Sequence, residues 1–310
     1  MKVAFVSSGN SLKTISPIIK AQGDSLTRLG LDVEYIPIEG KGLWGYLKSI
    51  PKIRKKIKEI DVDIVHAHFS FSAFAASLAG AKPIVVSLMG WNIEKRLLKL
   101  MIKIFNFLFW DACIVKSERM KQSLGIKDVI LLPNGVDTDC FKPMVKEVAM
   151  RYLGWSEDKT HILWAANPER PIKNFVLAKE AFNIMKKEDM ELHFLEDVPH
   201  DEMVYYYNAS DVVFLTSIAE GSPNVIKEAL ACNSKVVSTD VGDVSERFQG
   251  NPACFLTKHN ATDIAEKLKM ALDYKGVIET RELVMELDSK IIAEKLISLY
   301  KGILSKKKGL

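Results

Sequence analysis

The chain has 310 residues, of which 48% are hydrophobic and 26% are charged. That composition is typical of a globular protein with apolar material for two ordinary domains or one large α/β domain, and it excludes a disordered chain. The net charge of +4 conceals an asymmetry: residues 1–140 carry 20 Lys and Arg against 13 Asp and Glu, whereas the remainder carries 23 against 26. The basic excess is too diffuse for a nucleic-acid-binding surface, so we expect no nucleic-acid partner.

The cysteines and the N-terminus indicate the compartment. The four cysteines lie far apart without a CxxC pair, which is typical of a reduced cytosolic chain whose thiols pack in the core. The apolar run Val3–Val6 is too short for the core of a signal peptide, and no stretch of 18 uncharged apolar residues occurs. We therefore expect a cytoplasmic protein that is not exported and does not span a membrane.

Short apolar runs alternate with longer amphipathic segments along the first half of the chain. The runs predict strands at Val3–Val6, Val33–Ile38, Ile64–Ala67, Ile84–Leu88, Ala112–Val115 and Val129–Leu132. The segments between them predict helices at Ile15–Leu29, Leu47–Ile60, Phe71–Leu78, Ile93–Phe109 and Glu118–Leu124. Continuous apolar runs are typical of buried parallel strands, and the alternation indicates right-handed βαβ units.

The alternation stops at a turn-rich stretch, residues 132–137, and then resumes. Strands are predicted at His161–Ala165, Leu192–Leu195, Val212–Leu215, Lys235–Ser238 and Cys254–Leu256, with helices at Phe175–Met185, Asp201–Asn208, Pro223–Cys232, Ala261–Leu272 and Ile292–Ile303. We therefore predict two α/β domains, each a parallel sheet flanked by helices. Their expected limits are 1–140 and 141–290, and residues 291–310 are expected to form a C-terminal helix that packs back on the N-terminal domain.

Several familiar nucleotide-binding, metal-binding and hydrolase motifs are absent. Ser7-Ser8-Gly9-Asn10 follows the first strand, where a dinucleotide-binding chain has GxGxxG, and there is no GxxxxGK[ST], HExxH or GxSxG. Two Asp-x-Asp triplets, at 61–63 and 137–139, are of the type that holds a divalent cation on a sugar diphosphate. The first only introduces a buried strand and the second follows an Asn-Gly turn. Because a hard cation needs several converging oxygens, we expect no metal.

The stretch Glu220–Leu230, with the sequence EGSPNVIKEAL, directly follows a predicted strand. Ser222 is predicted to cap the next helix and Pro223 to be its first residue, because proline lacks only an N–H that would be unpaired there. The N–H groups of Asn224 and Val225 then point out of the helix N-terminus. Together with the positive end of the helix dipole they form a site suited to a phosphate.

Two carboxylates flank this predicted phosphate site. Glu228 lies four residues after Asn224, on the same face of the helix, and Glu220 projects from the loop before it. A carboxylate accepts paired hydrogen bonds from neighbouring hydroxyls, which suits both a ribose and a hexose.

These residues carry a resemblance to a known family. Glu220 and Glu228, with seven residues between them, resemble the E-x7-E motif of the retaining family-4 glycosyltransferases, which have the GT-B fold of two facing Rossmann-like domains. The resemblance extends over most of the chain. Residues 65–68, Val-His-Ala-His, are similar to the histidine motif of that family's N-terminal domain, and residues 134–137, Asn-Gly-Val-Asp, to its interdomain turn. The segment Asn167–Asn174 stands where the family places a basic pair on the diphosphate.

The resemblance implies a retaining transfer of a hexose from a UDP- or GDP-sugar to a glycan or a lipid-linked glycan. The N-terminal domain would bind the acceptor and the C-terminal domain the donor. Glu228 would bind the ribose hydroxyls and Glu220 the hydroxyls of the donor sugar. Lys173 with Arg170 would neutralise the diphosphate, and His68 would lie beside the reacting carbon. In this family the leaving phosphate oxygen takes the acceptor's proton, so neither a protein base nor a cofactor is expected.

Some positions depart from the family pattern. Met89 stands where the family commonly has a histidine, and the glycine-rich loop on the acceptor side is reduced to Gly9-Asn10. These departures leave a second hypothesis, a catalytically silent subunit or scaffold that binds a sugar nucleotide. A nucleotide-sugar 2-epimerase is a third, although it would need more carboxylates around the sugar. We expect His66 to be structural and to point to the face of its strand opposite His68.

Two basic amphipathic segments lie in the positively charged half. Residues 46–60 and 91–110 mix Lys and Arg with aromatic and aliphatic residues at helical spacing. Such a segment is either an ordinary helix with a solvated charged face or an interfacial helix on an anionic bilayer. If the acceptor is lipid-linked, we expect the second behaviour, with peripheral binding to the inner face of the cytoplasmic membrane.

Overall fold

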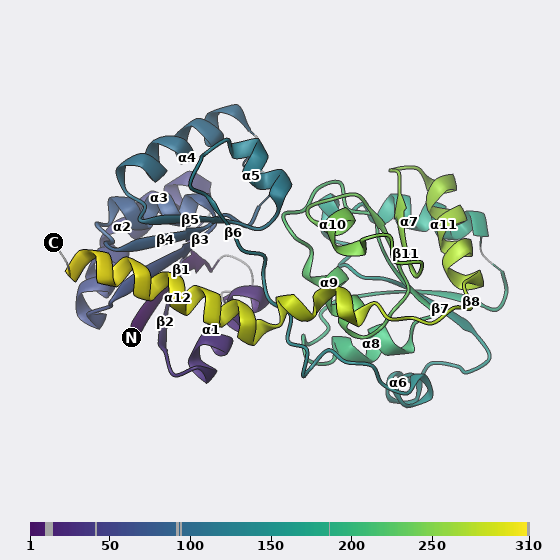
Figure 1. Ribbon diagram of the computed structural model, residues 1–310. Coiled ribbons are helices and arrows are strands. Elements are labelled where there is room, and N and C mark those ends of the chain that lie inside the picture. Colours follow the sequence, from purple (N-terminus) through teal and green to yellow (C-terminus); the bar gives the residue numbers. More distant parts are fainter. Residues whose placement is uncertain (10–14, 41, 91–92, 94, 186, 309–310) are drawn as a thin grey trace. The chain divides into compact units, whose positions relative to one another are not determined.

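The chain folds into two compact units, each with one sheet (Figure 1). The computed structural model describes residues 1–9, 15–40, 42–90, 93, 95–185 and 187–308. Unit 1 comprises Met1–Gly135 with Ser289–Leu310, and unit 2 comprises Val136–Asp288. Parallel strands connected through helices form both units, as the alternation of apolar runs and amphipathic segments predicts.

Unit 1 is built on a six-stranded parallel sheet with the order β2-β1-β3-β4-β5-β6. Its strands are β1 (Lys2–Ser8), β2 (Asp32–Ile38), β3 (Ile64–His68), β4 (Ile84–Ser87), β5 (Ala112–Val115) and β6 (Ile130–Leu131). Every residue of β3 and β4 is buried, because other segments of unit 1 cover both faces of the sheet at these two strands. All six strands lie within two residues of their predicted limits.

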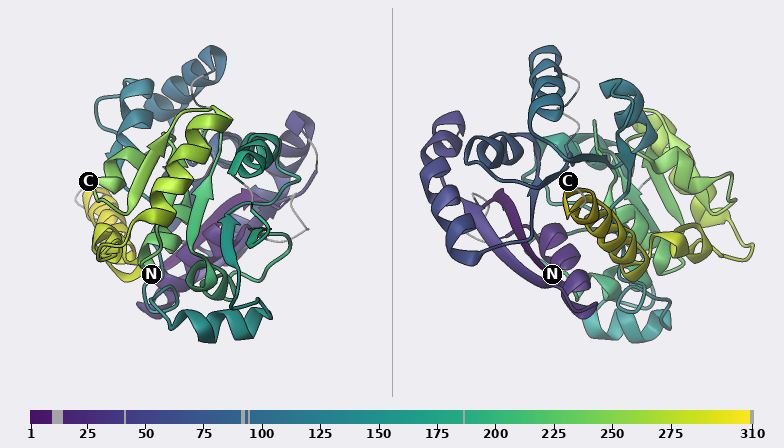
Figure 2. Two further views of the ribbon diagram at one scale, coloured as in Figure 1. Left: turned by 90° about the vertical axis from the view of Figure 1, so that its right-hand side faces the viewer. Right: turned by 60° about the vertical axis from the view of Figure 1, so that its left-hand side comes forward.

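Helices cover the sheet of unit 1. They are α1 (Pro17–Arg28), α2 (Gly42–Ile60), α3 (Ser70–Leu78), α4 (Arg96–Leu108), α5 (Glu118–Leu124) and α12 (Ser289–Lys308). The last of these comes from the far end of the chain and packs against α1 (Figures 1 and 2). Leu296 and Tyr300 on α12 are fully buried, and the Tyr300 hydroxyl lies 2.6 Å from Nδ1 of His66 on β3. The C-terminal helix thus completes the core of unit 1.

Unit 2 is built on a five-stranded parallel sheet with the order β11-β10-β9-β7-β8. Its strands are β7 (Thr160–Trp164), β8 (Met190–Phe194), β9 (Val212–Leu215), β10 (Val236–Thr239) and β11 (Cys254–Thr257). The central strands β9 and β10 are buried throughout, whereas β8 at one edge is only partly covered. The sheet order places β7 directly beside β9, so the loops that follow these two strands are neighbours.

The helices of unit 2 include two that the sequence analysis does not predict. The helical segments are α6 (Lys146–Leu153), η2 (Pro171–Lys173), α7 (Phe175–Met185), α8 (Met203–Ala209), α9 (Asn224–Ala231), α10 (Val244–Phe248), α11 (Ala261–Asp273) and η3 (Arg281–Leu287). The unpredicted α-helices, α6 and α10, are short, and neither has a side chain that caps its N-terminus. Their local start signals are therefore weak, and packing in the folded unit determines that they form.

The chain passes from unit 1 to unit 2 after Gly135 and returns after Asp288. The residues that follow Gly135 are tied into unit 2, which is why this limit precedes the expected limit at residue 140. The Thr138 hydroxyl donates to Oδ2 of Asp288 at 2.5 Å, and the Arg281 guanidinium donates to the carbonyls of Thr138 and Phe141 at 2.8 and 2.7 Å. The stretch 136–141, an isolated β-bridge at Val136 followed by turns, is therefore held by the C-terminal part of unit 2.

No helix in the described part of the chain combines the length and apolarity needed to cross a bilayer. The four cysteines are free thiols, and Cys113 and Cys232 are buried. Burial raises the pKa of the Cys113 thiol to about 12, so this thiol stays protonated and packs as an apolar group.

Candidate functional site

Two loops of unit 2 meet at the carboxyl ends of the neighbouring strands β7 and β9. The loop after β7 contains Lys173, and the loop after β9 contains Glu220. The buried hydroxyl of Thr216 donates to the carbonyl of Lys173 at 2.9 Å, and the N–H of Ile218 donates to the carbonyl of Ile172 at 2.9 Å. Because these bonds join one loop to the backbone of the other, the positions of the two predicted site residues are coupled.

Lys173 and Glu220 form an ion pair. The Lys173 ammonium lies 2.6 Å from Oε1 of Glu220, and the hydroxyl of Ser217 donates to the same oxygen at 2.9 Å. The side chains are only 8% and 18% exposed, so water screens the pair weakly. Arg170 is on the same loop but is exposed. The structure therefore brings together the predicted diphosphate lysine and the predicted sugar carboxylate, while Arg170 stays on the surface.

Glu228 is held by two side chains that the sequence analysis does not assign to it. The carboxylate is 3% exposed. Its Oε2 accepts the hydroxyl of Tyr207 on α8 at 2.8 Å, and its Oε1 lies 2.9 Å from Nε2 of His200 in the loop before α8. The hydrogen bond to Glu228 raises the pKa of His200 above its ordinary value of 6.5. Burial, together with the nearby carboxylate, holds the pKa of Tyr207 well above 10, so its hydroxyl remains a donor.

The N-terminus of α9 differs in detail from the prediction. The helix begins at Asn224, Pro223 occupies the cap position, and no side chain caps the helix, so the expected cap by Ser222 is wrong. The Ser222 hydroxyl instead donates to Oδ2 of Asp243 at 2.9 Å. A hydrogen bond from the Ser222 hydroxyl to an ionised carboxylate is stronger than one that the hydroxyl would accept from a backbone N–H. Asp243 lies in another loop, so the local sequence around Ser222 cannot reveal this partner. Asn224 and Val225 still form the first turn of α9, with backbone N–H groups at its N-terminus.

A buried group of charged residues lies behind the start of α9. Lys227 and Asp243 are each 1% exposed, and Arg247 Nε lies 3.8 Å from Oδ2 of Asp243. Burial lowers the pKa of Lys227 below its ordinary 10.5, and the charge of Asp243 opposes that shift. Local sequence does not reveal this group, because Lys227 resembles any helix-surface lysine when α10 is not predicted. Gly242 packs closely against Gly221, because a Cβ added at Gly242 would lie 2.8 Å from the Gly221 carbonyl oxygen. This contact holds the loop that carries Asp243 against the loop before α9.

His68 lies in unit 1, at the carboxyl end of β3, and is fully buried. Its Nε2 is 2.7 Å from the side-chain oxygen of Gln22, while Nδ1 is buried and has no partner among the described residues. Burial and the nearby Lys116 lower its pKa to about 3, so the ring is neutral at physiological pH. The His66 and His68 rings stack with centroids 4.4 Å apart. The expectation that they point to opposite faces is therefore wrong, because residues two apart on a strand share a face.

Gly9, one of the two residues expected on the acceptor side, directly follows β1. Gly9 is buried, and its N–H donates to the carbonyl of Ile38 at 2.9 Å. A Cβ at this position would lie 2.9 Å from Cβ of Pro37, so the close approach of the two strand ends requires glycine here. Asn10 lies outside the described residues.

The two Asp-x-Asp triplets hold backbone groups. Oδ2 of Asp63 accepts the N–H of Lys2 at 2.7 Å, and Oδ1 of Asp137 accepts the N–H groups of Asp139 and Cys140 at 3.2 and 3.1 Å. The second pattern is an Asx turn, the local use of aspartate that follows from its short side chain.

Two family models match separate segments of the chain. The model described as Glycosyltransferase Family 4 matches residues 20–140, and the model described as Glycosyl transferases group 1 matches residues 155–273. The chain belongs to the group 1, family-4 glycosyltransferases. In this family-4 chain the second matched segment contains Lys173, Glu220 and Glu228, and the first contains His68.

Individual proteins resemble this family-4 chain over different lengths. It is 28% identical over 181 residues to the D-inositol 3-phosphate glycosyltransferase of Paenarthrobacter aurescens, covering 48% of this chain and 44% of that protein. It is 25% identical over 268 residues to the putative teichuronic acid biosynthesis glycosyltransferase TuaC of Bacillus subtilis, covering 76% of this chain and 68% of that protein. The chain thus spans less than half of the first of these two relatives.

Solved structures show the fold of the family-4 chain. The sucrose-phosphate synthase of Thermosynechococcus elongatus superimposes with a TM-score of 0.87 over 99% of this chain and 100% of that one, at 14% identity. Anabaena Alr3699/HepE in complex with UDP-glucose superimposes with a TM-score of 0.72 over 100% of both chains, at 15% identity. The predicted GT-B fold class, with two parallel sheets flanked by helices, is therefore confirmed.

Proposed function

We propose that this chain transfers a hexose from a UDP- or GDP-sugar to a glycan or lipid-linked glycan, with retention of the anomeric configuration and without a metal. The observation that carries the proposal is the grouping in unit 2 of Lys173, Glu220 and Glu228 around the loops at the carboxyl ends of β7 and β9. Ligands of open α/β sheets bind outside the carboxyl ends of the strands. The solved complex of the structural neighbour HepE with UDP-glucose supports a donor of this class.

The diphosphate is assigned to Lys173 and to the N-terminus of α9. An ammonium has three N–H donors, so Lys173 can keep its bond to Glu220 and still donate to phosphate oxygens. The N–H groups of Asn224 and Val225, at the positive end of α9, add donors for the second phosphate. We place Arg170, which is exposed on the same loop, at the outer side of the diphosphate.

The two carboxylates take the hydroxyl groups of the donor. In Glu220 both contacts described above involve Oε1, and Oε2 takes part in neither, so Oε2 is assigned to hydroxyls of the hexose. In Glu228 Oε1 contacts His200 and Oε2 accepts from Tyr207, and a carboxylate has about four acceptor positions. The remaining positions are assigned to the ribose hydroxyls. Tyr207 and His200 keep this carboxylate in one orientation.

The reaction is a displacement on one face of the sugar. The bond between the anomeric carbon and the phosphate oxygen breaks, a bond from the acceptor oxygen forms on the same face, and the acceptor proton passes to the departing phosphate oxygen. Negative charge grows on the diphosphate as the first bond breaks. Lys173 and the N–H groups of α9 stabilise that charge where it develops, so this step needs neither a general base of the protein nor a metal. His68 is assigned to the acceptor side, next to the anomeric carbon.

A lipid-linked acceptor is supported by α4 of unit 1. Leu97, Leu100, Ile104 and Phe107 form an exposed apolar stripe on α4, and they are 72%, 55%, 46% and 87% exposed. The helix buries its opposite face through Leu98 and Ile102, and the basic residues Arg96, Lys99 and Lys103 lie beside the stripe. Apolar and basic residues side by side on one helix fit the interface of an anionic bilayer. We therefore propose peripheral binding to an anionic membrane surface through α4.

The proposal is tested by thermal stabilisation followed by turnover. The purified chain is heated with UDP-, GDP- and ADP-sugars, and a true donor at about a hundred times its Kd should add about 2.7 kcal/mol of stability. Release of free nucleotide is then measured with and without candidate acceptors, and with and without EDTA. Acceptor-dependent release that EDTA does not change supports the proposal. Binding without any turnover would favour a silent scaffold, and strict dependence on an added metal would refute metal-independent transfer.

A further inference from the structure

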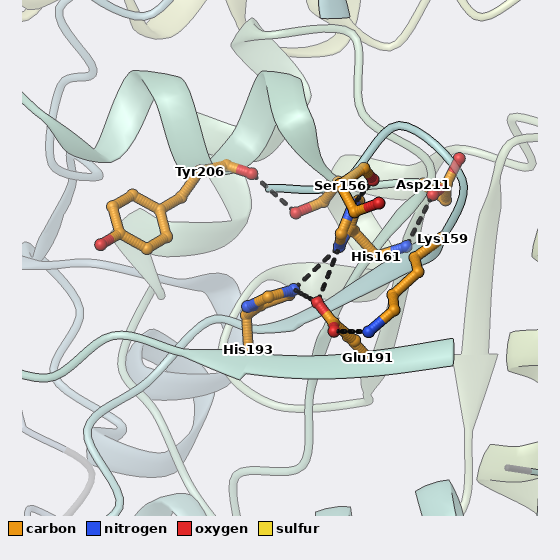
Figure 3. Close-up of polar contacts among 8 residues, drawn as sticks. Ser156, Lys159, His161, Glu191, His193, Tyr206 and Asp211 are labelled. Atoms are coloured by element: carbon orange, nitrogen blue, oxygen red, sulfur yellow. Dashed lines mark hydrogen bonds and ion pairs between the residues drawn. The ribbon is translucent and has the colours of Figure 1, made fainter. Parts of the chain in front are cut away.

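A second group of chemically capable side chains lies in unit 2 on β7 and the edge strand β8, away from the loops that carry Lys173 and Glu220. His161 is near the amino end of β7, whereas Lys173 follows the carboxyl end of the same strand. In the parallel pairing of β7 with β8, His161 is opposite Glu191, and His193 lies two residues further along β8. Residues opposite each other and residues two apart share a face of a sheet. His161, Glu191 and His193 are therefore presented on one face, and Figure 3 shows their side chains converging.

The three side chains offer one ligand atom each at spacings that suit a metal ion. Nδ1 of His161 lies 2.9 Å from Nε2 of His193, and Oε2 of Glu191 lies 3.7 Å from each of these nitrogens. In a tetrahedral zinc site, bonds of about 2.0–2.1 Å place the ligand atoms roughly 3.4 Å apart. A shift of a few tenths of an ångström in each side chain would therefore convert the present cluster into three legs of a tetrahedron.

A backbone carbonyl sets the tautomer of His161. Its Nε2 lies 2.8 Å from the carbonyl oxygen of Ser156, which can only accept, so Nε2 carries the proton (Figure 3). In this tautomer Nδ1 presents a lone pair towards His193 and Glu191. Metal-binding histidines characteristically donate their other N–H to a carbonyl or carboxylate in this way. With Nδ1 of His161 as acceptor, Nε2 of His193 carries the proton of their hydrogen bond. If that proton moves to Nδ1 of His193, Nε2 can offer a lone pair to a metal, and the ring loses no proton overall.

The surroundings hold the other two side chains in place. Lys159 forms an ion pair with Oε1 of Glu191, which leaves Oε2 facing the imidazoles. The ring of Trp155 stacks on His193 with centroids 3.6 Å apart. His161 is fully buried, but the side chains of His193 and Glu191 are 19% and 36% exposed. Water can therefore reach the cluster and supply a fourth ligand.

We propose that His161, Glu191 and His193 bind a divalent transition-metal ion of the zinc class through Nδ1, Oε2 and Nε2, with water as the fourth ligand. Two imidazoles and one carboxylate suit Zn²⁺, whereas Mg²⁺ and Ca²⁺ take mostly oxygen ligands. The ion would cross-link β7 to the edge strand β8. It lies away from the donor residues, so it stabilises unit 2 and takes no part in the transfer proposed above.

The test uses the full chain, freed of metal with EDTA and then dialysed. Zn²⁺ is titrated calorimetrically, and Co²⁺ is added separately as a spectroscopic probe of four-coordinate geometry. We expect one Zn²⁺ per chain, visible Co²⁺ absorption without thiolate bands, and a higher Tm with Zn²⁺. Loss of a residue that only hydrogen-bonds to a metal ligand weakens metal binding about 10–100-fold. Glu191→Gln and His193→Gln each remove a direct ligand, so we expect each to weaken zinc binding at least about 100-fold.

The matched control is His259→Gln, which removes a histidine outside the cluster and should leave zinc affinity unchanged. Circular dichroism without metal checks that all variants fold, and both cluster positions are partly exposed, so the substitutions leave no large cavity. Equal zinc affinity in wild type and His193→Gln would overturn the proposal, as would a Co²⁺ spectrum with thiolate bands. Donor binding by metal-free protein is measured in parallel, so that failure of this proposal is separate from failure of the proposed transferase function.

Discussion

The Lys173 ammonium and Oε1 of Glu220 lie 2.6 Å apart, and each of the two residues comes from a different loop of unit 2. This pair joins the predicted diphosphate contact to the predicted sugar contact in one hydrogen-bonded unit. A change at either residue therefore affects the other, because removal of one partner leaves a largely buried charge without its counterion.

Lys173→Ala should weaken the binding of UDP and GDP alike, whatever sugar is attached. A charge-assisted contact contributes about 1.5–3 kcal/mol, which corresponds to roughly 10–100-fold in affinity. Calorimetry with both nucleotides measures the effect, and Lys179→Ala, an exposed lysine on α7, is the matched control. Unchanged affinity for both nucleotides in Lys173→Ala would remove Lys173 from the diphosphate site.

Glu228→Gln and Glu220→Gln should have different consequences. The first should reduce the affinity for free nucleotide, because Glu228 is assigned to the ribose, and it should also destabilise the fold by about 1–3 kcal/mol through its buried bonds to Tyr207 and His200. The second should lower the turnover number but spare nucleotide binding, because the glutamine amide oxygen can still accept a hydrogen bond from Lys173. Binding and initial rates are compared for both variants. Normal binding and normal turnover in both would mean that the motif has no role in the reaction.

The titration of His200 should report its contact with Glu228. The hydrogen bond raises the pKa of His200 in the folded chain above 6.5. The stabilisation from the charged pair is therefore complete below pH 6.5 and disappears as the pH rises through the raised value. NMR of the His200 ring should show a pKa above 6.5 in the wild type and a lower one in Glu228→Gln. The same pKa in both proteins would show that the contact does not form in solution.

The buried histidines of unit 1 should make the fold sensitive to acid. Burial lowers the pKa of His68 to about 3 and holds that of His66 well below 6.5. The pKa of each histidine is lower in the folded chain than in the unfolded chain, so protonation favours unfolding. The stability that comes from the neutral, buried rings is therefore complete above pH 6.5 and is lost as the pH falls towards 3. For His68 alone the loss at pH 5 is about 2 kcal/mol relative to pH 8. Urea unfolding at both pH values should show a smaller loss in His68→Gln, and an equal loss would contradict the assignment.

The exposed stripe of α4 should bind anionic vesicles. Leu97→Ser with Phe107→Ser should reduce co-sedimentation with vesicles that contain phosphatidylserine, because both side chains are mostly exposed and would insert at the interface. Charge reversal of basic residues on both amphipathic helices, Lys55 and Lys56 on α2 and Arg96 and Lys99 on α4, should abolish binding. High salt should release the wild type from the vesicles, because the screening length falls from ~8 Å towards ~3 Å.

The control for the vesicle experiment is Val176→Ser with Ile184→Ser on α7, which removes comparable exposed apolar groups from unit 2. Nucleotide affinity of each variant checks that the fold is intact. Equal recovery on neutral and anionic vesicles, or recovery on neither, would mean that the basic residues of α4 are only solvated.

The sequence by itself determined most of the elements and the order in which they occur. The buried parallel strands are continuous apolar runs, and this signal is local, so all eleven lie within two residues of their predicted limits. The seven-residue spacing between Glu220 and Glu228 is also local, because the loop before α9 and the first turns of that helix contain it. The N-terminus of α9 was predicted to within one residue for the same reason.

Partners that come from other elements were decided only by the tertiary structure. Ser222 pairs with Asp243 instead of capping α9, and Glu228 is held by Tyr207 and His200. The group formed by His161, Glu191 and His193 depends on the register of β7 against β8. Such contacts follow from how strands and helices pack in three dimensions. A one-residue change of register would move every side chain of a strand to the other face without changing the local pattern, so periodicity along one segment cannot reveal them.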